Sequence, residues 1–244
     1  MKWKKLTEFP EQKVTKRSYG SSITYWKVEN GKVWHQWKKL MKADIETFEV
    51  YEDNDFIARD KDFVYHGWTK LAKVDRDSFQ EVGDSYWKDK NHAYMEYETS
   101  LKPLKGLDAA SFNYLGNGYA FDQNFAYYYG KVIKSCTQPT TLELIPKHKT
   151  FAKDAEHVFY ESAALKGADL KSWKPLKNGF SKDEKRVYFD ARKLPKVDIE
   201  TWEHLHRAYS KDKNRVYCMN YIEYDKSPAE WDKKKVVEFY KSGK

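Results

Sequence analysis

Cysteine is scarce in this sequence of 244 residues, which contains only Cys136 and Cys218. The two cysteines lack the spacing of metal ligands, so the sequence argues against a disulfide framework and a cysteine-based metal site. Long apolar stretches are also lacking. No window reaches the length of a membrane span, and the basic first ten residues have no apolar run typical of a signal peptide. We therefore expect a cytoplasmic protein without a membrane partner.

Recognisable catalytic motifs are missing as well. The sequence has no glycine-rich phosphate loop, and neither cysteine has a catalytic partner that the sequence identifies. His204 and His206 flank Leu205 on a predicted strand, but two ligands do not make a metal site. We expect a protein that is not an enzyme and uses no metal or cofactor. An enzyme with an unrecognised site, such as a hydrolase, is an alternative.

Aromatic residues, by contrast, are abundant. They make up 17% of the chain, within an apolar content of 40%, and include 19 tyrosines and nine tryptophans. Rings must therefore supply much of the buried surface, and the polar tips of Tyr and Trp suit a thin assembly in which most residues lie near solvent. Charges of both signs are frequent, and 45 basic against 37 acidic residues leave a moderate net charge of +8.

The aromatic residues recur in a fixed pattern. When the first apolar position is counted as zero, an acid follows at plus three, a small aliphatic residue at plus seven and an aromatic residue at plus eight. Seven copies occur at intervals of 29 to 33 residues, which is typical of a repeat protein. The copies begin at Trp26, Ile57, Tyr86, Tyr119, Phe151, Phe180 and Tyr209.

Each copy predicts a β-hairpin. In the sixth copy, residues 180–182 and 187–189 would form the two strands, and residues 183–186 would form the polar turn. An Asp at the start of such a turn can accept a hydrogen bond from the backbone two residues on, which explains the acid at plus three. We interpret the seven acids as turn formers, and a ladder of metal or catalytic sites is the lesser alternative.

A second motif, D-x-x-[ST]-[FW], predicts a short capped helical turn whose last, large residue enters the core. The motif spans Asp44–Phe48, Asp75–Phe79, Asp108–Phe112, Asp169–Trp173 and Asp198–Trp202. In the fourth and seventh repeats, we expect Thr140–Leu144 and Ser227–Trp231 to replace it, each with a Glu that completes a capping box. The large residue comes late in the third and fourth repeats, so we expect insertions near residues 97–105 and 130–139.

These units predict a mainly β protein with short helical turns, in which seven hairpin-plus-helical-turn repeats stack into an elongated, twisted array. A closed, seven-bladed, propeller-like ring is the alternative, although about 31 residues are few for a four-stranded blade. We expect residues 1–24, which include Trp3, Leu6 and Phe9, to form an N-terminal cap segment. Residues 25–231 would hold the repeats, and residues 232–244 would form a C-terminal cap or tail.

Two of the predicted turns carry the literal sequence D-K-N. Asp89-Lys90-Asn91 is followed by Ala93-Tyr94, and Asp212-Lys213-Asn214 is followed by Val216-Tyr217. These runs, and the D-x-x-[ST]-F turns, resemble the DKNYY family of bacterial repeat proteins, and the resemblance covers residues 25 to 231. The resemblance implies a bacterial repeat protein. It implies no activity, so no catalytic residue carries over.

Function is expected where the repeats differ. At plus eleven the first three copies have Trp37, Trp68 and Tyr97, whereas the last four have small residues or Asn. Lysines surround this aromatic row, among them Lys38, Lys70 and Lys102. Rigid rings beside positive charge are typical of an interface for an acidic partner, and ring packing between hairpins is the structural alternative. Tyr128 and Tyr129, beside a predicted insertion, form a second candidate patch.

We therefore expect a non-catalytic protein-binding repeat protein whose partner is another protein with an acidic surface. By analogy of class, such a bacterial protein could be an immunity protein that neutralises a cognate toxin domain in a toxin–antitoxin pair. A basic, aromatic nucleic-acid-binding module is the competing hypothesis. The acids in every repeat and the moderate net charge argue against nucleic acid.

Overall fold

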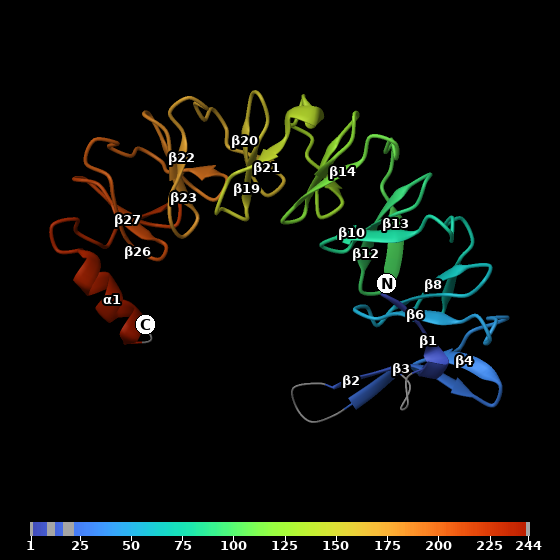
Figure 1. Cartoon of the computed structure of the whole chain (residues 1–244). Coiled ribbons are helices and arrows are strands. Elements are labelled where there is room, and N and C mark those ends of the chain that lie inside the picture. The colour runs from blue at the N-terminus through green and yellow to red at the C-terminus, as the bar shows by residue number, and fades with distance from the viewer. Residues whose placement is uncertain (1, 9–12, 17–21, 243–244) are drawn as a thin grey trace. The chain divides into compact units, whose positions relative to one another are not determined.

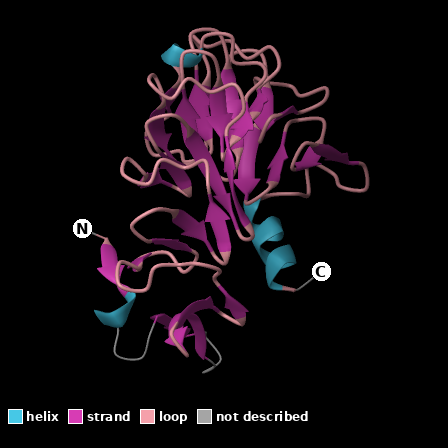
Figure 2. Ribbon diagram, turned by 90° about the vertical axis from the view of Figure 1, so that its right-hand side faces the viewer, coloured by secondary structure: helices cyan, strands magenta, loops and turns pink. Residues whose placement is uncertain are grey.

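The computed structural model describes residues 2–8, 13–16 and 22–242. Within these residues the fold is mainly β and consists of seven separate antiparallel sheets, none of which closes into a barrel. The sheets follow one another in sequence order, as the colours of Figure 1 show, and Figure 2 shows how far strands predominate over helices. The predicted mainly β repeat fold is thus confirmed. The chain divides into two compact units, Met1–Tyr114 and Leu115–Lys244.

The first unit contains three sheets, with strand orders β2-β3-β4-β5, β1-β6-β7-β8-β9 and β10-β11-β12-β13 among the described residues. A short 3-10 helix, η1 (Leu6–Glu8), follows the first strand. The strands are β1 (Trp3–Lys5), β2 (Lys13–Lys16), β3 (Ser22–Glu29), β4 (Lys32–His35), β5 (Lys38–Lys39), β6 (Glu49–Tyr51), β7 (Ile57–Arg59), β8 (Val64–His66), β9 (Thr69–Leu71), β10 (Gln80–Gly83), β11 (Tyr86–Lys88), β12 (Ala93–Tyr97) and β13 (Ser100–Pro103).

The four remaining sheets each have four strands in sequence order, from β14 to β29, within the described residues. They are followed by α1 (Lys233–Lys241), and η2 (Pro139–Thr141) is a 3-10 helix before β18. The strands are β14 (Asn113–Gly116), β15 (Tyr119–Phe121), β16 (Ala126–Tyr128), β17 (Lys131–Val132), β18 (Glu143–Leu144), β19 (Phe151–Lys153), β20 (Val158–Tyr160), β21 (Ala163–Ala164), β22 (Lys174–Pro175), β23 (Phe180–Lys182), β24 (Val187–Phe189), β25 (Arg192–Lys193), β26 (Glu203–His206), β27 (Tyr209–Lys211), β28 (Val216–Cys218) and β29 (Tyr221–Glu223).

The predicted hairpins form the centre of each sheet. In the last sheet, β27 pairs with β28 so that position zero faces plus nine, as Tyr209 faces Cys218. Two outer strands, which the sequence pattern does not predict, flank each hairpin. They are short enough, at two residues each for β21 and β25, for four strands to fit into a repeat of about 31 residues.

The Asp at plus three organises the turn in the second to seventh repeats, as predicted for the Asp series. In the second repeat, Oδ1 of Asp60 accepts hydrogen bonds from the backbone N–H groups of Asp62 and Phe63, at 2.9 and 2.8 Å. Its Oδ2 accepts from the Tyr65 hydroxyl at 2.7 Å and from the Asp44 N–H at 3.1 Å. Burial opposes the charged form of Asp60, but these hydrogen bonds outweigh it and hold the pKa of the carboxyl below its usual value.

One carboxylate therefore joins three pieces of chain: its own turn, the Tyr at plus eight and the start of the D-x-x-[ST] motif before it. The same four acceptor contacts occur around Asp89 and Asp212, which are almost fully buried. The first repeat differs because Glu29 replaces Asp there. Asn30 and Gly31, with φ angles of 50° and 65°, instead form a tight turn between β3 and β4.

The large residue that ends the second motif packs between successive hairpins, as predicted. Phe48 is buried, and its ring centroid lies 5.5 Å from that of Trp26 and 5.6 Å from that of Tyr65. The turn before it is capped as expected, because Oδ1 of Asp44 accepts hydrogen bonds from the backbone N–H and the hydroxyl of Thr47. In most repeats this segment is one hydrogen-bonded turn, and in the fourth it is η2.

The position of this motif in the fourth repeat was predicted wrongly. Gln138, not Thr140, precedes the helical turn, and Leu142, not Leu144, is the buried residue at its end. Thr141 takes the role of the motif's Ser or Thr: its hydroxyl donates to the Gln138 carbonyl and accepts from the Ala155 N–H. The motif therefore starts and ends two residues earlier than predicted. The sequence misleads here because Thr140 is itself a residue type that commonly caps helices.

The terminal segments pack against the repeats. Strand β1 pairs with β6, and Leu6 enters the core of the first unit. Phe9, which was predicted to belong to the N-terminal cap, lies outside the described residues. The C-terminal tail forms α1, whose first turn is capped by Asp232 through a 2.8 Å hydrogen bond from the Lys235 N–H. Val236 of this helix is fully buried against the last sheet.

Candidate functional site

The predicted aromatic row begins on tight turns at one edge of the first two sheets. The turn between β4 and β5 consists of Gln36 and Trp37, and the turn between β8 and β9 consists of Gly67 and Trp68. The first residue of each turn is left-handed, with φ of 53° and 55°. This geometry is typical of two-residue hairpin loops and pushes the second side chain outward. Trp37 is accordingly 71% exposed and Trp68 is 41% exposed.

The corresponding turn of the third repeat is displaced along the chain. Strand β12 extends to Tyr97, which pairs with Ser100, so the turn consists of Glu98 and Thr99. The insertion predicted near residues 97–105 thus lengthens this hairpin. Tyr97 shares the plus-eleven position with the two tryptophans in sequence, but it ends a strand and Thr99 occupies their place in the turn.

Three successive turns and the hairpins below them surround an open cavity of about 450 Å³. Trp37, Trp68 and Glu98 come from the turns, whereas Tyr25, Phe56 and His66 come from the strands and their ends. The centroids of the Trp37 and Trp68 rings lie 6.4 Å apart with the rings tilted by 41°. The cavity is large enough for a small ligand or a partner's side chain.

The predicted lysines of the first unit lie beside three different rings. Lys38 lies with the tryptophans, because its ammonium is 4.1 Å from the Trp68 ring centroid. Lys102 lies 5.4 Å from the ring of Tyr97, which does not line the 450 Å³ cavity. Lys70 contacts Phe63 at 4.1 Å and lines a separate cavity of about 280 Å³. The predicted row is therefore a pair of tryptophans with Lys38, and the remaining residues flank it.

The charge of these lysines is not neutralised by acidic residues in the described part of the chain. Lys38, Lys70 and Lys102 are exposed and contact rings. Three lysines of the repeat turns behave differently, because each pairs with the Asp that opens the motif before its own hairpin. The pairs are Lys61–Asp44 at 3.2 Å, Lys90–Asp75 at 2.6 Å and Lys213–Asp198 at 2.9 Å. Lys38, Lys70 and Lys102 thus place positive charge without an ion pair in the described residues on the last strand of each sheet of the first unit.

A buried polar layer below the tryptophans was missed from the sequence. His35 and His66 both stand at plus nine and are almost completely buried. Nε2 of His35 is 3.1 Å from the Asp55 carbonyl oxygen, and Nε2 of His66 is 3.3 Å from Oε1 of Glu96. The sequence signal was available, since the later repeats have Met, Tyr, Phe or Cys at plus nine.

The protonation of this layer follows from its contacts. Burial lowers the pKa of His35 to about 4, and the contact with the Asp55 carbonyl oxygen offsets only part of the effect. Burial alone would raise the pKa of Glu96. Contacts with His66, Asn54 and Trp87 outweigh burial and hold the pKa of Glu96 below its usual value. The buried polar layer therefore contains a neutral His35 and an ionised Glu96 at neutral pH.

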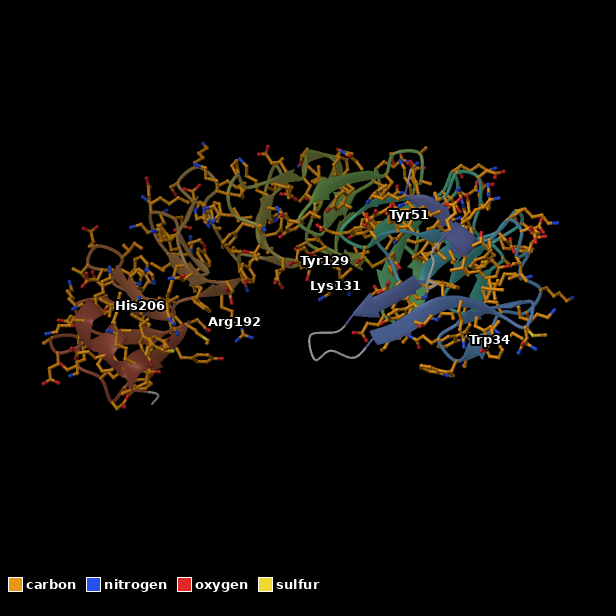
Figure 3. All side chains as sticks on the ribbon, turned by 60° about the horizontal axis from the view of Figure 1, so that its bottom comes forward. Trp34, Tyr51, Tyr129, Lys131, Arg192 and His206 are labelled. Carbon is orange, nitrogen blue, oxygen red and sulfur yellow. The ribbon has the colours of Figure 1, made fainter. Side chains whose placement is uncertain are left out.

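Tyr128 and Tyr129, the second predicted patch, lie in the second unit. Their rings form an edge contact with centroids 4.9 Å apart, and Tyr129 is 43% exposed. Tyr129 opens the tight turn between β16 and β17 with a φ of 44°, and its ring covers Gly118 so closely that a Cβ there would collide with it. Figure 3 labels Tyr129 beside Lys131, which pairs with Tyr128 across this hairpin.

The described residues include neither a cluster of metal ligands nor a membrane-spanning helix. No group of three or more His, Cys, Asp or Glu residues in the described ranges is arranged to hold a metal ion. His204 and His206 contact different partners: Nε2 of His204 is 2.8 Å from the Arg207 carbonyl oxygen, and the ring of His206 packs on Tyr240. Among the described helices, none has the length and apolar character needed to cross a membrane.

Comparison with known proteins gives one relationship. The model described as the DKNYY family matches the chain twice, over residues 2–98 and over residues 97–221. No curated protein and no solved structure matches the chain. The first match includes both turn tryptophans and the histidines below them, and the second includes Tyr128 and Tyr129.

Proposed function

The chain belongs to the DKNYY family, and we propose that it is a non-catalytic protein-binding module whose partner docks on the turns of the first unit. The observation that carries this proposal is the exposed pair Trp37 and Trp68 at neighbouring hairpin turns. A large ring that is exposed to water is unfavourable, and its burial by a partner would contribute favourable free energy. Tryptophan is also among the residues that contribute most to binding energy when a partner buries it.

The charge around the tryptophans defines the partner that fits. Lys38, Lys70 and Lys102 lack acidic partners in the described part of the chain, and the net charge of the protein is +8. A partner with an acidic surface would gain attraction during encounter and would supply the missing counter-charges. We propose a cognate toxin domain as that partner, which makes this protein an immunity protein of a toxin–antitoxin pair. This finer role rests on analogy of class.

Affinity capture tests the proposal. The tagged, full-length protein is incubated with lysate of the source cells, and captured proteins are identified by mass spectrometry. We expect an acidic protein whose binding weakens about thirtyfold in Trp37→Ala, because a buried tryptophan anchor contributes roughly 2 kcal/mol or more. Binding should also weaken as salt is raised, because exposed charges are screened.

A matched control uses another exposed ring. Tyr224 is 88% exposed and lies in the second unit, so Tyr224→Ala removes a surface aromatic residue without touching the turns of the first unit. This variant should capture the partner as the unmodified protein does. Full capture by a folded double variant, Trp37→Ala with Trp68→Ala, would contradict the proposed surface. Hydrolytic activity that copurifies with homogeneous protein would contradict the non-catalytic role.

A further inference from the structure

The cavity below Trp37 and Trp68 has an unusual lining. Four aromatic rings, those of Tyr25, Trp37, Phe56 and Trp68, surround it together with His66 and with polar residues of the turns. The rings are tilted and do not stack flat on each other: Tyr25 and Phe56 are at 63°, with centroids 5.5 Å apart, and the two tryptophans are at 41°. Tilted rings keep part of their π faces available to a ligand.

The charges of the lining favour a cation. Glu98 is the acidic residue among the described lining residues, which include neither Lys nor Arg. The faces of aromatic rings carry partial negative charge, so four rings and a carboxylate together attract positive charge. The chain itself shows this preference, because the Lys38 ammonium lies 4.1 Å from the Trp68 ring centroid.

The chemistry of the lining also selects among cations. A primary ammonium is strongly hydrated and requires several acceptors when it is buried, and a guanidinium, although it can stack on rings, keeps five N–H donors that need acceptors. The cavity offers one exposed carboxylate and mostly ring faces. A methylated ammonium group has no or few N–H donors to satisfy and loses little hydration, so it fits a cage of rings best.

We propose that this cavity binds the quaternary ammonium group of a small amine of the choline type. The tryptophans form the walls, Tyr25 and Phe56 form the floor, and Glu98 supplies the counter-charge at the rim. This site goes beyond the proposed protein interface and does not depend on it. The two proposals share Trp37 and Trp68, but the acidic partner is attracted by Lys38, Lys70 and Lys102, which do not line the cavity, whereas the cavity takes a ligand of the opposite charge.

Calorimetric titration of the full-length protein with choline tests the proposal, with 3,3-dimethyl-1-butanol as the neutral ligand of nearly the same shape. We expect choline to bind about tenfold more tightly than the alcohol, because cation–π attraction in a partly desolvated site contributes roughly 1–2 kcal/mol. Choline binding should be lost in Trp37→Ala and weakened several-fold in Glu98→Gln. Tyr224→Ala should leave it unchanged.

Three results would overturn the proposal. They are no measurable heat with millimolar choline, equal affinities for choline and the alcohol, and choline binding that survives Trp37→Ala. Trp37 is the appropriate residue to change because it is 71% exposed, so its loss should leave the fold intact, which circular dichroism can verify. Failure of the titration leaves protein capture unaffected, so the two proposals can fail separately.

Discussion

The Asp at plus three and the Tyr at plus eight recur in most repeats because their side chains form a hydrogen bond that holds the turn. The carboxylate accepts two backbone hydrogen bonds in its own turn, and its second oxygen accepts the phenol, as Asp89 accepts the Tyr94 hydroxyl at 2.7 Å. The pair is buried, so loss of either member leaves a polar group without its partner. The fifth repeat is a natural exception, because Phe159 stands where the phenol would be.

This exception predicts opposite effects of two substitutions. Tyr94→Phe removes a hydrogen bond to a buried carboxylate and should lower the free energy of unfolding by about 2 kcal/mol. Phe159→Tyr should raise it by about 1 kcal/mol, because Oδ2 of the buried Asp154 accepts no hydrogen bond from an N–H or O–H group of the described residues, and the Cys136 thiol beside it is only a weak donor. Chemical denaturation of both variants measures the two changes. A loss of stability in Phe159→Tyr would show that the ring pocket cannot accommodate the hydroxyl.

Cys136 has a related place in the fifth repeat. Burial, together with the nearby Asp154 carboxylate, raises the pKa of the Cys136 thiol to about 12. A protonated, partly buried thiol is a weak donor and a poor nucleophile. Cys136 therefore stands beside the carboxylate that lacks a phenol, and its chemistry is structural.

The central hairpins of the sheets could be predicted from the sequence, whereas the outer strands could not. They could be predicted because an apolar residue at position zero, an acid at plus three, an aliphatic residue at plus seven and a ring at plus eight recur in each repeat. This spacing determines both the turn and the face that is buried. The outer strands could not, because pieces such as Ala163–Ala164 are too short to show alternation. The structure places Trp37 and Trp68, two of the predicted site residues, as exposed rings on the turns. Tyr97 was grouped with them because sequence offsets do not reveal that β12 is longer.

The motif of the fourth repeat gives a direct test at the level of an element. Thr140 and Thr141 are both exposed, but the hydroxyl of Thr141 donates to the Gln138 carbonyl and accepts from the Ala155 N–H, whereas Thr140 makes neither bond. Thr141→Ala should therefore lower the free energy of unfolding by about 1 kcal/mol, as the loss of a capping side chain does. Thr140→Ala is the matched control and should change it by less than about 0.5 kcal/mol. Equal effects of both, measured by thermal denaturation, would restore the capping box predicted from the sequence.

At the scale of the whole molecule, the same repeated sheet carries different turn residues in the first two repeats and in the last four. The second turn residue is Trp in the first two repeats and Gly, Ser, Ala or Asn in the last four. The residues at plus nine change in parallel, from the buried His35 and His66 to the half-buried Tyr128, Tyr160, Phe189 and Cys218. The Asp turns, by contrast, are alike in both units. Residues that differ between repeats therefore mark the candidate site, and residues that recur build the sheets.

The recurring buried phenols make the whole protein sensitive to alkaline conditions. Burial, helped by neighbouring carboxylates or phenols, raises the pKa of tyrosines in both units above the usual value of 10.0. For Tyr51, Tyr160 and Tyr188 the pKa is raised to about 12. A group whose pKa is raised in the folded state stabilises the fold fully below its unfolded pKa, and this contribution is lost as the pH rises through the folded value.

We therefore expect the free energy of unfolding to fall steeply between about pH 10 and pH 12, with tyrosinate absorbance appearing together with loss of the β-sheet signal. The reason is that a phenolate beside a buried carboxylate, as in the Tyr94–Asp89 pair, places two negative charges in a site built for one. Tyr94→Phe is the control, because it removes one ionisable phenol and should make the fall shallower although the starting stability is lower. Complete tyrosine ionisation in a protein that stays folded would show that these phenols are far less buried than the structure places them.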